Sequence, residues 1–145
     1  MNLMIRAANI GDLTAITQHD THMPVNLIAE KISRKEIYVV YEGENFAGWL
    51  RYGYFWDIVP FMNMLELLPE YRGNGIGRLL VEFWETEMKT QGHTQVMTST
   101  QQNEHAQHFY IALGYVAVGG FVQSLDAITE DSYEVIFVKK LCDKI

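Results

Sequence analysis

The chain has 145 residues, 48% of them hydrophobic, and a formal net charge of −7. This length allows one domain with a substantial core, and the apolar content is that of a globular protein. The negative charge argues against nucleic acid as a partner, because phosphate neutralisation needs clustered lysine and arginine. It is compatible with a cationic substrate, and it equally serves solubility.

Membrane and secretion signals are not evident in the sequence. No apolar run reaches the length of a membrane span, and the first residues lack the pattern of a signal peptide. The only cysteine is Cys142, so a disulfide framework is excluded and a reduced setting is favoured. We therefore expect a cytoplasmic protein that does not bind membranes.

Hydrophobic periodicity and turn residues predict alternating strands and helices along the chain. Asn9 or Asp12 is expected to cap the first helix, which ends near His19. The alternation predicts a mixed α/β sheet in one domain spanning 1–145. The expected strands are 3–7, 36–42, 46–55, 62–68, 94–100, 115–122 and 133–139, and the later helices are 26–33, 75–91 and 103–113.

The run 65–78 reads as a buried strand, a tight glycine loop and the start of a helix. Backbone N–H groups at a helix N-terminus are unpaired, and the helix dipole adds partial positive charge there. Glycines let the backbone approach an anion and permit the φ values of an amide nest. Arg72 and Arg78 flank the loop and can add charge-assisted contacts. The run therefore predicts a phosphate-binding site.

The glycine spacing excludes two common phosphate loops. A dinucleotide fingerprint needs G-x-G-x-x-G, but Arg78 stands where the third glycine should follow Gly73 and Gly75. A P-loop needs G-x-x-x-x-G-K-[ST], and Arg78 again occupies the position of the second glycine. The spacing that is present is Arg72-x-x-Gly75-x-Gly77.

This spacing resembles the acyl-CoA pyrophosphate loop of the GCN5-related N-acetyltransferase (GNAT) family, written [RQ]-x-x-G-x-[GA]. A second segment, NEHAQHFYIALGY at 103–115, is similar to the family pattern N-x-x-A-x-x-F-Y-x-x-L-G-[FY] and matches every fixed position. The two motifs occur in the family's order and together cover about 65–115. The resemblance implies a mostly antiparallel sheet with helices on both faces, splayed beside the strand that precedes the loop.

The resemblance also implies acetyl-CoA as co-substrate, with its pantetheine arm in the splay. The loop backbone would hold the pyrophosphate, and an N–H near Leu67 would polarise the thioester carbonyl. Arg72 could equally be a solvated surface charge. Asn103 would offer an amide, and Ala106 would leave space for the cofactor. The expected cofactor-binding residues are Leu65, Glu66, Leu67, Arg72, Gly73, Asn74, Gly75, Ile76, Gly77, Arg78, Asn103, Ala106 and Tyr110.

Tyr110 is the catalytic residue that the resemblance implies. It shares one helix face with Asn103 and Ala106, at positions i, i+3 and i+7. A tyrosine with a pKa near ~10 can give a proton to the departing CoA thiolate at neutral pH. The alternative is a packed aromatic residue whose hydroxyl is bonded within the protein.

The general base is not evident from the sequence. The candidates are Asp57, His19, His22 or a water chain, because an amine must lose a proton before it attacks. Glu66 lies on the critical strand, but alternation turns its side chain away. The histidines form no metal motif such as H-E-x-x-H, so we expect no metal.

We therefore expect an acetyl-CoA-dependent N-acetyltransferase in which a primary amine attacks the thioester directly. The acceptor stays open between a small-molecule amine and a protein or peptide N-terminus. A non-catalytic CoA-binding sensor is the alternative from another class, supported by the absence of an evident base. The oligomeric state is also open, although relatives commonly form a homodimer through the last strands.

Overall fold

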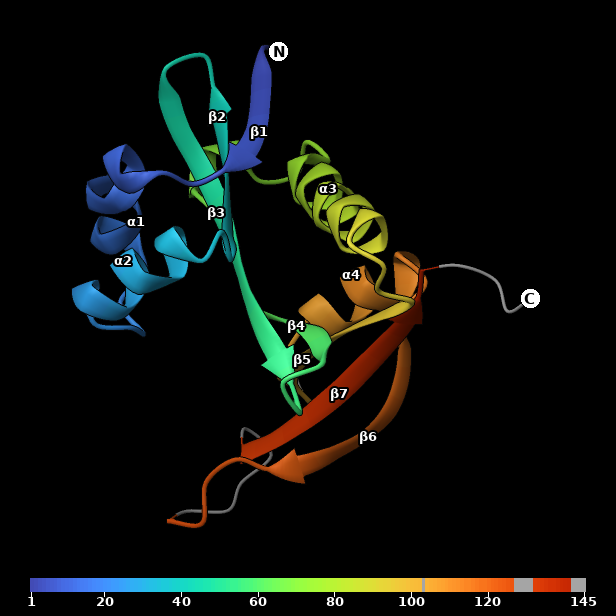
Figure 1. The fold of residues 1–145 in the computed structure, drawn as a ribbon. Coiled ribbons are helices and arrows are strands. Elements are labelled where there is room, and N and C mark those ends of the chain that lie inside the picture. The colour runs from blue at the N-terminus through green and yellow to red at the C-terminus, as the bar shows by residue number, and fades with distance from the viewer. Residues whose placement is uncertain (103, 127–131, 142–145) are drawn as a thin grey trace. The chain divides into compact units, whose positions relative to one another are not determined.

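The computed structural model describes residues 1–102, 104–126 and 132–141. Strands and helices alternate along them in the order that the sequence predicts (Figure 1). The elements are β1 Leu3–Ala7, η1 Ile10–Asp12, α1 Leu13–His19, α2 Val25–Ser33, β2 Ile37–Glu42, β3 Asn45–Phe55, β4 Val59–Leu67, η2 Pro69–Tyr71, α3 Ile76–Thr90, β5 Gln95–Gln101, α4 Ala106–Ala112, β6 Val116–Val122 and β7 Tyr133–Lys140, where η marks a 3-10 helix.

The strands form a mixed, mostly antiparallel sheet, as predicted. Their hydrogen-bonded order is β1-β2-β3-β4-β5-β7-β6. The pairs β1–β2, β2–β3, β5–β7 and β6–β7 are antiparallel, whereas β4 and β5 pair in parallel. Parallel neighbours need a long crossover connection, and here that connection contains the glycine loop and α3.

The chain divides into two compact units. The first comprises Met1–Gly53 and Asn63–Thr86, and the second comprises Tyr54–Met62 and Glu87–Ile145. The divisions therefore fall inside β3, β4 and α3. The predicted splay of the sheet concerns the arrangement of the two units and stays a prediction.

In the first unit, one face of the strands packs on α1 and α2. Asn9 caps the entry to this layer, since its side chain accepts from Gly11 N and Asp12 completes a capping box. Leu27, which the periodicity places on the buried side of α2, is 40% exposed instead. The buried residues of this layer are Ala8, Ile16, Ile28, Ile32, Ile37, Val39 and Trp49.

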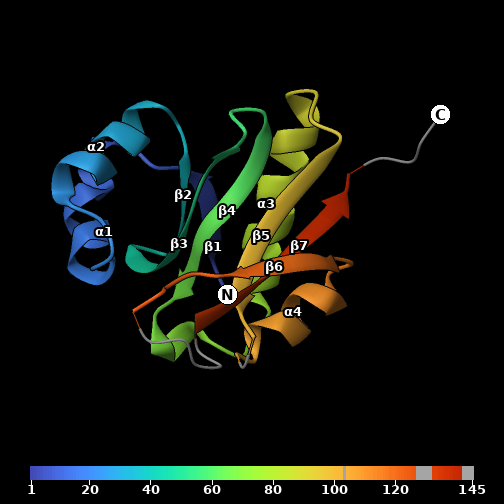
Figure 2. The ribbon, with the colours of Figure 1, turned by 90° about the horizontal axis from the view of Figure 1, so that it is seen from below.

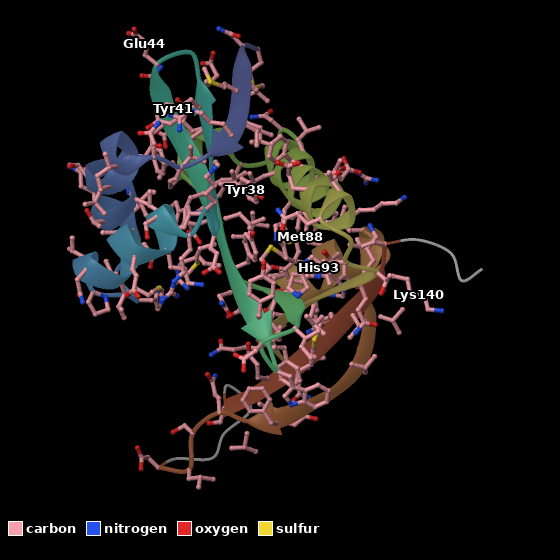
Figure 3. All side chains as sticks on the ribbon, in the orientation of Figure 1. Tyr38, Tyr41, Glu44, Met88, His93 and Lys140 are labelled. Atoms are coloured by element: carbon pink, nitrogen blue, oxygen red, sulfur yellow. The ribbon has the colours of Figure 1, made fainter. Side chains whose placement is uncertain are left out.

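The other face of the first unit's strands packs on α3. Tyr38 lies between Ile37 and Val39 in β2, so its side chain points to the opposite face of the sheet. Figure 3 labels Tyr38 among the side chains of this unit. Its ring stacks on that of Tyr52 at 6.0 Å and meets Phe83 of α3 edge-on at 5.3 Å. Figures 1 and 2 both show α1 and α2 on one side of these strands and α3 on the other. The predicted helices on both faces are thus confirmed for this unit.

In the second unit, α4 covers β5 and β7. Tyr110 of α4 lies 6.0 Å from Phe137 of β7, measured between ring centroids. The helix begins at Ala106, later than the predicted start at Asn103, since Glu104 lies outside any helix and His105 lies in a turn. Glu104 N donates to Gln101 O at 3.1 Å, and Thr100 Oγ1 donates to the Glu104 carboxylate at 2.9 Å. These two bonds delay the helix by closing the turn after β5.

Candidate active site

The end of β4, where the sequence places Leu65, Glu66 and Leu67, is held closely against β3 in the first unit. Leu68 N donates to Ala47 O at 2.8 Å. A Cβ on Gly48 would lie only 2.4 Å from Glu66 O, so only glycine permits this approach of the two backbones. The strand that should lie beside the pantetheine arm therefore has a fixed backbone.

Arg72 reaches back from the loop to this strand end. Its Nε donates to Leu67 O at 2.9 Å, and its Nη2 donates to Glu66 Oε1 at 3.0 Å. The Arg72 and Glu66 side chains are 55% and 43% exposed. Arg72 thus links the loop to the last two residues of β4, a contact that the sequence did not indicate.

The loop glycines adopt the backbone conformation that the sequence predicts. Gly73 has φ +81° and Gly75 has φ +80°, in the left-handed region that side chains disfavour. Apart from the adjacent residues in the chain, no described residue has a heavy atom within 4 Å of the position where a Cβ would stand at either glycine. The requirement for glycine is therefore one of backbone conformation, and the space beside the loop is open.

The loop leads directly into α3. Leu79 N donates to Gly75 O at 3.2 Å, which makes Gly75 the residue from which the helix starts. Ile76 is fully buried and anchors the first turn, in which Gly77 also lies, whereas Arg78 is exposed and pairs with Glu82 at 3.3 Å. Asn74 lies between the two left-handed glycines. The N–H groups of a first helical turn have no partners within the helix, so this end can receive an anion.

Tyr110 lies in the second unit, on α4, and is only 7% exposed. Its ring packs against Phe109, Tyr115 and Phe137. Its hydroxyl is hydrogen-bonded to the side chain of Thr98 on β5. Thr98 in turn donates from Oγ1 to Met62 O of β4 at 3.0 Å. The phenol is therefore both packed and hydrogen-bonded within its own unit.

The surroundings of Tyr110 favour its protonated form. Burial raises the pKa of the Tyr110 phenol, and the negative charges of Glu104 and Glu134 act in the same direction. The hydrogen bond to Thr98 opposes them, because it stabilises the phenolate. The result is a pKa above the ordinary value of a tyrosine, so Tyr110 carries its proton at neutral pH.

The remaining motif residues are only partly described. Ala106 is half-buried and is the first residue of α4, one turn before Tyr110. Asn103 lies outside the described residues. His105 and His108 are exposed.

The three candidate bases are divided between the units. His19, at the end of α1, is exposed and stacks on Phe46 at 5.9 Å. His22 is also exposed, and its backbone N–H donates to Asp20. Asp57 belongs to the second unit, in the exposed turn between β3 and β4, where its φ is +60°. None of the three is therefore distinguished by burial.

The first unit contains a buried ion pair that the sequence did not indicate. Asp20 and Arg51 are 2% and 6% exposed, and Arg51 Nε donates to Asp20 Oδ2 at 2.7 Å. Trp49 Nε1 donates to the same carboxylate at 3.1 Å. The only available signal was Arg51 itself, a charged residue inside an apolar strand that must find a partner.

The pKa of Asp20 reflects this pairing. Burial alone raises the pKa of the Asp20 carboxyl, but hydrogen bonding and charge from Arg51, with the amide of His22 and the indole of Trp49, outweigh it. The pKa of Asp20 therefore lies below its ordinary value. The carboxylate is charged at neutral pH, and it fastens the end of α1 to β3.

The described residues contain neither a metal-binding cluster nor a membrane-spanning helix. No group of three or more His, Cys, Asp or Glu side chains in 1–102, 104–126 and 132–141 could hold a metal ion. In that same part of the chain, every helix is too short or too polar to cross a membrane.

A family model and several solved structures match the chain. The model of the Acetyltransferase (GNAT) family matches residues 9–115, which include both motifs. No curated protein matches the chain.

Solved structures of low sequence identity share the fold. Ard1 from Thermoplasma volcanium has a TM-score of 0.83 at 13% identity, and the match covers 99% of this chain and 100% of that chain. The spermidine/spermine N-acetyltransferase SpeG from Vibrio cholerae has a TM-score of 0.76 at 17% identity, with 97% and 93% covered. Naa50 from Arabidopsis thaliana, in complex with the bisubstrate analogue CoA-Ac-MVNAL, has a TM-score of 0.75 at 17% identity, with 96% and 99% covered.

Proposed function

We propose that this chain, which belongs to the GNAT family of acetyltransferases, transfers an acetyl group from acetyl-CoA to a primary amine. The observation that carries the proposal is the loop between β4 and α3. Gly73 and Gly75 are both left-handed, and the space where their side chains would stand is open. A pyrophosphate can approach such a backbone at a helix N-terminus without displacing any protein atom.

The first unit would hold the cofactor. The backbone N–H groups of 73–78 would bind the pyrophosphate, and Arg78 would add charge near the phosphates. The end of β4 would lie along the pantetheine arm and pair with its amides as an added strand does. When bound, acetyl-CoA supplies the activated thioester. The N–H near Leu67 would donate to the carbonyl oxygen and stabilise the negative charge that develops there.

Tyr110 is the acid in this proposal. Tyr110 Oη is protonated at neutral pH because burial raises the pKa of the phenol. A phenol in this state can give its proton to a thiolate leaving group. Its ring packs against Phe137 and Tyr115, and the residue is only 7% exposed. Asp57, His19, His22 or a water chain would accept the proton that the amine loses.

The acceptor in this proposal is a small-molecule amine. The Vibrio cholerae protein is named for spermidine and spermine, and the net charge of −7 suits a cationic amine. The alternative is a peptide N-terminus, which the peptide part of the analogue bound by Arabidopsis Naa50 exemplifies.

Thiol release from acetyl-CoA tests the proposal and names the acceptor class. Polyamines, amino sugars and peptides with free N-termini would be supplied separately, and the acetylated product would be identified by mass spectrometry. We expect release only with a small amine. Release only with peptides would instead identify the acceptor as a peptide N-terminus. If acetyl-CoA binds but no amine causes thiol release, the result would contradict the proposed enzymatic activity and favour a CoA sensor.

A further inference from the structure

Thr98 connects Tyr110 to the backbone of β4. Thr98 is 1% exposed, and its Oγ1 donates to Met62 O at 3.0 Å. The same hydroxyl is hydrogen-bonded to the Tyr110 side chain, and all three residues belong to the second unit. A threonine hydroxyl carries one hydrogen and two lone pairs, so it can donate to one of these neighbours while it accepts from the other.

We propose that Thr98 is a positioning residue for catalysis, which holds the Tyr110 hydroxyl in place and donates a hydrogen bond to it once its proton has left. The inference rests on the proposed function, because it assigns Tyr110 as the acid. It extends that function by naming the group that stabilises the acid after proton transfer. Sequence reasoning did not single out Thr98, since a threonine in a strand is ordinary.

The proposed step balances in protons and charge. While Tyr110 is neutral, Thr98 donates to Met62 O and accepts from the phenol. When the Tyr110 proton moves to the departing sulfur, the negative charge moves from sulfur to the phenolate oxygen. Rotation about the Cβ–Oγ1 bond of Thr98 then brings its hydrogen to that oxygen. A hydrogen bond to a charged group is stronger than the neutral one to Met62 O that it replaces.

The charged groups that act on the Tyr110 pKa do not stabilise a phenolate. Glu104, before α4, and Glu134, on β7, both oppose a phenolate through their negative charge. Lys139, also on β7, is directed to another ring, since its Nζ lies 5.6 Å from the centroid of Tyr115. His105 and His108 lie on exposed parts of the helix segment that carries Tyr110. Of the influences that act on the Tyr110 pKa, the Thr98 hydroxyl is the one that lowers it.

Two substitutions at Thr98 separate positioning from packing. Thr98→Val keeps the branched shape and removes the hydroxyl, whereas Thr98→Ser keeps the hydroxyl and removes a methyl group. We expect Thr98→Val to lower kcat about tenfold, the factor that corresponds to one hydrogen bond of ~1.4 kcal/mol, with little change in KM for acetyl-CoA. Thr98→Ser should restore most of the rate. In a Tyr110→Phe background, Thr98→Val should cause almost no further loss, because the two residues act as one unit.

A titration without substrate tests the hydrogen bond independently of turnover. In fluorotyrosine-labelled protein, the fluorine NMR signal of Tyr110 is assigned by its loss in Tyr110→Phe. We expect Thr98→Val to raise the pKa of this phenol and Thr98→Ser to leave it near the wild-type value. An unchanged pKa in Thr98→Val would overturn the proposal. So would a loss of kcat that is equally large in the Tyr110→Phe background.

The two readouts also separate this inference from the proposed function. A chain that shows the pKa change but acetylates no amine would contradict the proposed function and leave the Thr98–Tyr110 bond established. A chain that acetylates amines while Thr98→Val shows neither effect would retain the function and overturn the role of Thr98.

Discussion

Tyr110 combines the two properties that an acid at this position needs, a retained proton and a fixed orientation. Its raised pKa follows first from burial and then from the charges of Glu104 and Glu134. Its orientation follows from the rings around it and from Thr98. The two properties have a common origin, because the packing that excludes water also fixes the ring.

Replacing Tyr110 with phenylalanine should slow turnover and spare cofactor binding. The ring packing is retained, but the proton donor is lost, so we expect kcat to fall on the order of 100-fold. The affinity for acetyl-CoA, measured by calorimetry, should be nearly unchanged. In the wild-type enzyme, deprotonation of Tyr110 should lower the rate only above about pH 10, since its pKa is raised. An unchanged kcat in Tyr110→Phe would contradict the role of acid.

Asp20→Asn should destabilise the chain without a direct effect on acetyl transfer. The substitution leaves Arg51 buried without a countercharge, which typically costs about 3–5 kcal/mol. Urea unfolding at neutral pH measures the loss. Glu30→Gln is the control, because the Glu30–Arg34 pair lies at the surface and contributes less than about 1 kcal/mol.

The pH dependence of this difference has a defined sign. The pKa of Asp20 is lowered in the folded chain, so its contribution to stability is fully present above the unfolded pKa, near ~3.9. The contribution is lost as the pH falls below that value toward the folded pKa. The gap between wild type and Asp20→Asn should therefore be constant near neutral pH and shrink below about pH 4. Equal stability at neutral pH would show that the pair contributes nothing.

At the scale of elements, the junction of β4, the loop and α3 concentrates the features that a cofactor site needs. Gly48 lets β3 approach Glu66, and Arg72 ties the loop to Leu67. The left-handed glycines then turn the chain into α3. Strand, loop and helix are thus held as one piece of the first unit.

Arg72→Ala should separate two roles for this arginine. If Arg72 mainly holds the end of β4, its loss should lower kcat more than it weakens acetyl-CoA binding. We expect that outcome, because both described bonds of Arg72 go to Leu67 and Glu66. Arg34→Ala, which breaks an exposed pair on α2, is the matched control and should change neither quantity. Weaker binding at an unchanged kcat would instead identify Arg72 as a phosphate ligand.

Gly75→Ala should abolish most of the affinity for acetyl-CoA. An alanine at φ +80° is strained by about 1–2 kcal/mol, and its methyl group would occupy the open space beside the loop. Gly43→Ala is the matched control, because Gly43 also has a positive φ and open space. Gly43 is adjacent in sequence to Glu44, which Figure 3 labels at the tip of the β2–β3 hairpin. Acetyl-CoA should raise the Tm of Gly43→Ala but not that of Gly75→Ala, and equal shifts would refute the loop assignment.

At the scale of the whole molecule, the features that could be predicted from the sequence are those set by local sequence patterns. Strand and helix order followed from periodicity. The glycine spacing indicated a loop with unusual φ values, which Gly73 and Gly75 adopt, whereas the motif glycine Gly77 lies in α3 without a positive φ. The start of α4 was predicted too early, because the bond from Thr100 to Glu104 holds a turn there.

Contacts between distant segments were not predictable in the same way. Asp20 and Arg51 are 31 residues apart in the sequence, and Met62 and Thr98 are 36 apart. Periodicity reports which face of an element is buried, but not which polar side chain on another element it meets. The pairing of Arg72 with Glu66 is a further example. From the sequence alone, Arg72 could be either a surface charge or a phosphate ligand. These pairings required the fold.

Calorimetric titration of acetyl-CoA into the purified chain tests the central claim most directly, since it needs no knowledge of the acceptor. We predict saturable binding of one acetyl-CoA per chain, lost in Gly75→Ala and retained in Gly43→Ala and Tyr110→Phe. No heat of binding for the wild-type chain, or equal binding by the two glycine variants, would contradict the account of this protein as an acetyl-CoA-dependent acetyltransferase.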